Sequence, residues 1–179
     1  MKSINRLLLI FLSGLMLFAQ QVSADVIVRF NPSNTTVYTS DTFNIDVIAD
    51  ISDPVLGWGL DLWYDPSFLS LPGSPIIGPL WQPAFAPDGD GLAALAFPNS
   101  ISQNDILLAT ITFKAGQTIG GTDLILSITT GDLTEGFPLD PTGFDQATFL
   151  NGHVTILPEP ASIVILLISG LLGIRRRRL

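Results

Sequence analysis

Between residues 25 and 156, hydrophobic and polar positions alternate with a period of two, in short runs separated by turn residues. Such alternation is typical of β-strands with one buried face, and this region contains no helical period of useful length. The pattern predicts strands at residues 26–30, 42–49, 57–64, 91–97, 106–115, 123–129 and 147–156. Clusters of Pro, Gly, Asn and Asp between the runs favour turns. The chain is therefore predicted to fold as an all-β sandwich.

Alternation within single strands predicts which side chains face the core, because successive side chains point to opposite faces of a sheet. The predicted core-facing side chains of three strands are Phe43, Ile45 and Val47; Trp58, Leu60, Leu62 and Tyr64; and Ala109, Ile111 and Phe113. The predicted solvent-facing side chains are Asn44 and Asp46; Asp61, Trp63 and Asp65; and Leu108, Thr110, Thr112 and Lys114. The sheets are thus expected to have one wet side.

Residues 1–24 do not follow this pattern. Lys2 and Arg6 precede an apolar run over residues 7–19, and the segment closes on the small or modest side chains of residues 22–24. This arrangement predicts a secretory signal peptide cleaved before Asp25, which makes signal peptidase and the general secretion machinery partners. The alternative is an N-terminal membrane anchor, but the run is short and is followed by polar residues 20–21.

The other end of the chain has three parts in a fixed order: Pro158-Glu159-Pro160, an apolar stretch over residues 163–174, and four arginines at 175–178. The prolines hold Glu159 in an extended, accessible conformation. The arginines stay cytoplasmic by the positive-inside rule and stall export. As a hydrophobic helix, residues 161–174 would span about 21 Å, less than the roughly 30 Å of a bilayer core. Transient attachment to the membrane is predicted, with a permanent single-span anchor as the alternative.

This ordered tail, residues 157–179, resembles the PEP-CTERM sorting signal of Gram-negative, exopolysaccharide-producing bacteria. In the resemblance, the motif is Pro158, Glu159 and Pro160, and the membrane stop is Arg175, Arg176, Arg177 and Arg178. The resemblance implies recognition by an exosortase, a membrane enzyme similar to cysteine transpeptidases. It also implies that the protein is released or transferred outward, to the cell envelope or the extracellular matrix.

The net charge becomes much more negative when the two terminal segments are left out. Between residues 25 and 160 only Arg29 and Lys114 oppose all 16 acidic residues, which gives 2 − 16 = −14, against −8 for the whole chain. Nucleic acid and anionic membranes are therefore poor partners for this region. Because the chain has no cysteine, the core must stabilise the exported domain without disulfides. The length of this region fits one domain of ordinary size, and no second domain is needed.

Four segments of the region, at residues 41–47, 57–69, 108–116 and 151–156, read like successive strands of a cohesin domain. The most telling are the Tyr64-Asp65-Pro66 sequence and the strand LATITFKA at residues 108–115. The resemblance implies a nine-stranded, flattened jelly-roll β-sandwich over residues 25–156. Cohesins of cellulosomes bind dockerins, whereas many cohesin-like domains have no known dockerin partner. The resemblance therefore implies the fold more firmly than the function.

No catalytic residues are predicted, and an enzyme is not expected. The single histidine, His153, follows a predicted tight turn at residues 151–152 and is interpreted as a structural or exposed residue. The sequence contains no cysteine nucleophile and no Gly-x-Ser-x-Gly elbow. Carboxylate pairs are plentiful, but a glycosidase also needs a raised pKa and a defined separation across a cleft.

Calcium is the cofactor that the sequence leaves open. Asp88 and Asp90 place two oxygen ligands two residues apart on a Gly-rich loop. Leu92 and Asn99 occupy positions where an EF-hand needs oxygen-rich and bidentate ligands, so the loop is not an EF-hand. An irregular site completed by distant carboxylates is one interpretation, and a simple turn is the other.

Aromatic residues give the remaining candidates for ligand binding. Trp63, flanked by Asp61 and Asp65, would stack on a sugar ring while the carboxylates accept hydrogen bonds from its hydroxyls. Trp81 and Phe85 lie in a long Pro- and Gly-rich connection, where such aromatics either bind ligands or plug the edge of the sandwich. We therefore expect an exported, non-enzymatic surface or matrix protein that interacts with another protein or with polysaccharide. The alternative is a carbohydrate-binding module of the exopolysaccharide matrix.

Overall fold

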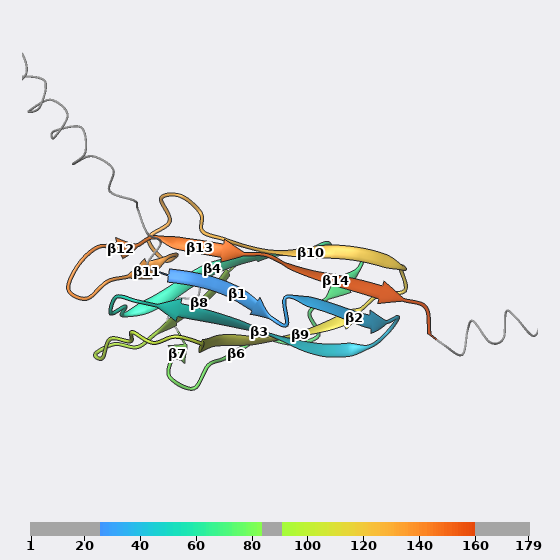
Figure 1. Ribbon diagram of the computed structural model, residues 1–179, viewed down its shortest axis with the longest axis horizontal. Helices are drawn as coiled ribbons and strands as arrows, with labels where there is room; N and C mark the ends of the chain where they lie inside the picture. Colours follow the sequence, from blue (N-terminus) through green and yellow to red (C-terminus); the bar gives the residue numbers. More distant parts are fainter. Residues whose placement is uncertain (1–25, 84–90, 160–179) are drawn as a thin grey trace, which may run out of the picture.

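The computed structural model describes residues 26–83 and 91–159, which form two stacked β-sheets (Figure 1). The first sheet has the order β13-β1-β3-β9-β5, with β6 also paired to β9. Its strands are β1 (Val26–Asn31), β3 (Thr42–Ile51), β5 (Leu69–Ser70), β6 (Ile76–Ile77), β9 (Ile106–Ala115) and β13 (Ala147–Leu150). The predicted signal peptide and the predicted C-terminal hydrophobic helix lie outside the described residues.

The second sheet has the order β2-β14-β10-β4-β8-β7. Its strands are β2 (Asn34–Tyr38), β4 (Gly57–Trp63), β7 (Gln82–Pro83), β8 (Gly91–Leu95), β10 (Gly120–Ser127) and β14 (Gly152–Leu157). A short hairpin of β11 (Phe137–Pro138) and β12 (Phe144–Asp145) lies at one end of the sandwich (Figure 1). Within residues 26–83 and 91–159, no helix is long and apolar enough to cross a membrane.

The predicted strand at residues 147–156 is wrong in one respect, because the chain changes sheet in its middle. β13 pairs in parallel with β1 in the first sheet, and β14 pairs in parallel with β2 in the second. The crossing passes through Asn151 and the buried Gly152. A Cβ on Gly152 would lie 2.9 Å from the ring of Phe30, so only glycine lets the chain pass this close to the core.

The other predicted strands are confirmed, with boundaries that differ by a few residues. β9 has the predicted bounds, β3 continues to Ile51, and β10 begins at Gly120. The pattern missed β2, because its sequence NTTVY contains a single aliphatic residue, Val37. It also missed the two-residue strands, which are too short to show a period.

The core lies between the sheets. The alternation of side chains along the strands predicted most of its residues. Ile45, Trp58, Leu60, Ile111 and Phe113 are each at most 2% exposed. The ring of Phe113 is stacked 5.9 Å from that of Phe43 and lies edge-on to that of Tyr64, 5.6 Å away. The aromatic side chains predicted to share the core face therefore do pack together.

The prediction that Leu108 faces solvent is wrong, since its side chain is fully buried. The β3–β9 register pairs Val47 with Ala109 but Ile48 with Leu107, so Leu108 is an extra residue in β9. Such a β-bulge reverses the alternation of side chains. The predicted alternation of buried and outward side chains in β9 therefore holds only from Ala109 onward.

Candidate functional site

The outer face of the second sheet carries the exposed tryptophan that the sequence predicted. Trp63 is 55% exposed at the end of β4. In the β4–β10 register, Trp63 lies opposite Ile125, and Asp61 lies opposite Ser127. With Asp123 further along β10, these outward side chains form a surface that we call the β4–β10 face: Asp61, Trp63, Asp123, Ile125 and Ser127.

The two carboxylates predicted to flank Trp63 differ in their surroundings. Oδ2 of Asp61 accepts a hydrogen bond from the hydroxyl of Thr129 at 2.9 Å and stays on the face. Oδ1 of Asp65 accepts one from the backbone N–H of Ser67 at 2.8 Å, in the turn that follows β4. Hydrogen bonds from the side chain and backbone of Ser67 lower the pKa of Asp65. The structure thus places Asp61 and Trp63 on one face, whereas Asp65 stabilises its own turn.

His153 lies at the surface of the second sheet, beside Asp123. Its Nδ1 is 2.7 Å from Oδ1 of Asp123, and the two residues are directly paired between β14 and β10. His153 and Asp123 therefore form a cross-strand surface pair next to the β4–β10 face.

Trp81 is not at the surface, which argues against the prediction that it binds a ligand and fits the alternative that it plugs the sandwich. It is 5% exposed and packs edge-on against Trp58, with ring centroids 6.3 Å apart. Its indole N–H donates to the carbonyl of Leu107 at 3.0 Å. Both ring and N–H of Trp81 are therefore engaged within the sandwich.

The candidate calcium ligands Asp88 and Asp90 lie outside the described residues, as does Phe85. Among residues 26–83 and 91–159, no group of three or more His, Asp or Glu side chains is arranged to hold a metal ion.

Charge divides unequally between the two sheets. Arg29 and Lys114 both lie on the first sheet, in β1 and β9. Arg29 is engaged there by Asp50, at 2.6 Å, and by Asp105. The described strands of the second sheet contain Asp61 and Asp123 but no lysine or arginine. The β4–β10 face is therefore acidic and partly apolar.

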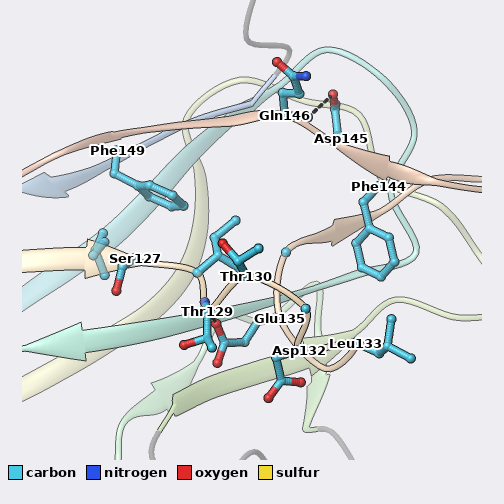
Figure 2. Close-up of a pocket in the computed structure, with 14 residues that line it drawn as sticks. Ser127, Thr129, Thr130, Asp132, Leu133, Glu135, Phe144, Asp145, Gln146 and Phe149 are labelled. Carbon is cyan, nitrogen blue, oxygen red and sulfur yellow. Dashed lines mark hydrogen bonds between the residues drawn. The ribbon is translucent and has the colours of Figure 1, made fainter.

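A second feature, which the sequence did not predict, is an open hollow of about 840 Å³ beside the β11–β12 hairpin (Figure 2). We call it the β10–β12 hollow. Its walls come from the end of β10, the loop that follows it, and β12. Gln146, between β12 and β13, and Phe149 of β13 complete them. Phe144 and Phe149 lie on opposite sides of it (Figure 2). Its side-chain oxygens and nitrogens belong to Ser127, Thr129, Thr130, Asp132, Glu135, Asp145 and Gln146.

Hydrogen bonds fix the loop that forms one wall of the hollow. Oδ1 of Asp132 accepts from the N–H and the hydroxyl of Thr134, at 2.8 and 2.6 Å, which lowers the pKa of Asp132. The buried carboxylate of Glu135 accepts from the N–H of Thr129. Two backbone hydrogen bonds, of 2.9 and 2.8 Å, join Gly136 to Gly59 of β4. The loop is thus tied both to itself and to the second sheet.

Comparison with known proteins identifies the fold. The chain matches the third ScaB cohesin of R. flavefaciens, solved in complex with a group 1 dockerin, at a TM-score of 0.59 and 12% identity, covering 75% of this chain and 96% of that one. It matches a non-cellulosomal cohesin from the archaeon Archaeoglobus fulgidus at 0.56 and 15%, covering 76% and 93%. It matches the cohesin module of a Clostridium perfringens family 33 glycoside hydrolase at 0.59 and 12%, covering 76% and 100%.

No protein-family model and no curated protein matches the chain. The described domain therefore has a cohesin-like sandwich fold, as its sequence predicted.

Proposed function

We propose that this protein is an exported, non-enzymatic component of the cell surface or extracellular matrix, and that its cohesin-like domain binds another protein. The observation that carries the proposal is the β4–β10 face, where Trp63 is more than half exposed on an acidic sheet. Exposed tryptophans surrounded by polar groups are frequent anchors of protein interfaces. The absence of lysine and arginine from the strands of this sheet favours a partner with basic residues around an apolar centre.

A dockerin-like module is the partner class that the fold suggests, since the R. flavefaciens cohesin was solved with a dockerin. The test measures binding of the full-length chain to purified dockerin modules encoded in the same genome. Trp63→Ala is expected to weaken binding at least tenfold, as the loss of about 1.4 kcal/mol or more at an interface anchor does. Ile27→Ala, an exposed residue of the first sheet, is the control and should bind like the wild type.

A second candidate function is carbohydrate binding at the same face. The observation that favours it is the position of Asp61 beside Trp63, with a carboxylate that already accepts a hydroxyl hydrogen bond from Thr129. A sugar would stack on the indole and donate to the carboxylate. Glycan binding lost in Trp63→Ala would favour this function over protein binding.

Export and sorting complete the proposal. They are supported by the apolar N-terminal segment, by Pro158-Glu159-Pro160 and by the arginines at 175–178. The measurement is mass spectrometry of the C-terminus of the extracellular form. A chain that ends near Pro160 supports processing by an exosortase, whereas a chain in membranes with its arginines intact would refute it.

A further inference from the structure

The structure contains a second candidate site, which does not involve Trp63. We infer that the β10–β12 hollow binds a neutral saccharide. The inference does not depend on the protein-binding proposal, because Ser127 is the only residue that the hollow shares with the β4–β10 face.

The first argument is the hydrogen-bonding character of the lining. Ser127, Thr130 and Gln146 supply groups that both donate and accept, while Asp132 supplies a carboxylate that accepts. A sugar hydroxyl is itself both donor and acceptor, so it can use all of these groups. An ammonium or guanidinium group only donates and could not use the amide and hydroxyl donors.

Anionic ligands are disfavoured for a different reason. The lining contains Asp132, Glu135 and Asp145, but no lysine, arginine or histidine. A uronic acid or a sulfated sugar would bring its charge close to three carboxylates with no cation to compensate. The saccharide is therefore expected to be neutral.

The second argument is the pair of aromatic side chains that face each other across the hollow (Figure 2). Phe144 is 49% exposed, although it is a large apolar side chain on a short hairpin. Its ring packs against Gly136, where a Cβ would lie 3.1 Å away and where φ is +99°. The ring is thus held against the hairpin while Phe144 stays about half exposed, as a side chain that stacks on the C–H face of a pyranose needs.

The third argument is that the site is already ordered. The N–H of Asp132 donates to the carbonyl of Thr129 at 3.1 Å, and Gly136 is joined to Gly59 by two backbone hydrogen bonds. Since these bonds fix the loop before any ligand arrives, binding costs little conformational entropy.

The experiment titrates the full-length chain with short neutral gluco-, manno- and galacto-oligosaccharides, using calorimetry and a detergent that carries no sugar. We expect millimolar or tighter binding of at least one series. Phe144→Ala is expected to weaken that binding about tenfold, and Gln146→Leu several-fold, as for the loss of an aromatic contact and a hydrogen bond. Leu150→Ala is the matched control, because Leu150 is also 49% exposed but lies outside the hollow.

Three results would overturn the inference. They are the absence of binding to every neutral series, binding that Phe144→Ala leaves unchanged, and stronger binding of spermine or of a polyuronate than of any neutral sugar. Trp63→Ala separates the two proposals, because it should impair protein binding and leave saccharide binding in the hollow intact. Circular dichroism of each variant confirms that a loss of binding is not a loss of fold.

Discussion

At the scale of single residues, Asp50 of β3 links β1 to the residue that precedes β9. One carboxylate oxygen accepts from Arg29 of β1 at 2.6 Å, and the other accepts from the backbone N–H of Asp105 at 2.8 Å. The hydrogen bond from the Asp105 backbone, together with Arg29, lowers the pKa of Asp50. Asp105 has a positive φ of 55°, which costs conformational energy unless such contacts hold it.

Replacing Asp50 with asparagine should therefore destabilise the domain by about 1 kcal/mol at neutral pH, a small value because the pair is partly exposed. A lowered folded-state pKa gives stability that is present above the unfolded value and is lost as pH falls through the folded one. The difference between wild type and Asp50→Asn should thus be constant from neutral pH to about pH 5 and shrink below about pH 4.

Urea unfolding at several pH values measures this difference. Asp53→Asn is the control, because Asp53 is an exposed aspartate in a neighbouring loop. A difference for Asp50→Asn that grows as the pH falls would contradict the prediction.

Gly59 shows how one missing side chain shapes the candidate sites. A Cβ at this position would lie 2.1 Å from the carbonyl oxygen of Thr134, so the loop beside the hollow could not remain bonded to β4. Gly59→Ala should destabilise the fold by about 1–3 kcal/mol, the usual cost of overpacking. Thermal unfolding measures it against Gly73→Ala, where an added Cβ meets nothing within 4 Å. Equal melting temperatures for the two variants would show that the loop moves away freely.

At the scale of elements, the bulge in β9 decides which leucine belongs to the core. Leu108 is fully buried, whereas its neighbour Leu107 is only partly buried. Leu108→Ala should cost about 2–5 kcal/mol, as for other buried leucines. Leu107→Ala should cost about 1 kcal/mol or less, since it removes less buried apolar surface. Denaturant unfolding of both variants tests the register, and a larger loss for Leu107→Ala would mean that β9 has no bulge at this point.

The same strand shows what an amino-acid pattern can and cannot predict. Alternation identified Ile111 and Phe113 as core residues, because each apolar residue there has a polar neighbour on either side. Alternation failed at Leu107-Leu108-Ala109, where consecutive apolar residues give no period and the bulge depends on pairing with β3. It also failed at Asn151, where the inward positions shift by one residue, from Ala147 and Phe149 to Gly152, Val154 and Ile156, and the prediction treated both runs as one strand.

Of the two candidate sites, the sequence predicted one and missed the other. The exposure of Trp63 was predicted, since it follows from parity within β4 alone. The β10–β12 hollow was not, because its walls come from segments whose proximity depends on the sheet topology and on the Gly59–Gly136 contact. The burial of Trp81 likewise depends on its contacts with Trp58 and Leu107, which lie far away in the sequence.

At the scale of the whole molecule, the sandwich leads directly into the proposed sorting tail. β14 ends at Leu157, which is paired with Tyr38 of β2, and Pro158 follows at once. The carbonyl of Leu157 accepts a hydrogen bond from the N–H of Thr39 at 2.9 Å. This end of β14 lies opposite the β11–β12 hairpin along the sandwich (Figure 1). A tail attached to the membrane would therefore leave the β10–β12 hollow at the distal end of the domain.

The absence of a linker has a consequence for processing. An enzyme that binds an extended segment around Pro158-Glu159-Pro160 would have to open the last pairing of β14, at about 1 kcal/mol for each backbone hydrogen bond lost. A Gly-Ser spacer inserted between Leu157 and Pro158 removes this requirement. It should therefore raise the rate of processing in cells by roughly fivefold to tenfold, the factor that corresponds to that free energy.

Pulse-chase labelling of the full-length chain in its producing cells would measure this rate. The same spacer inserted after Gly73, where an added Cβ meets nothing within 4 Å, is the control and should leave the rate unchanged. An unchanged or lower rate with the spacer at Leu157 would mean that the enzyme reads the motif while β14 stays paired. In that case the exposed Glu159, next to the end of the sheet, would be sufficient for recognition, and the sandwich itself would form part of the surface that the enzyme binds.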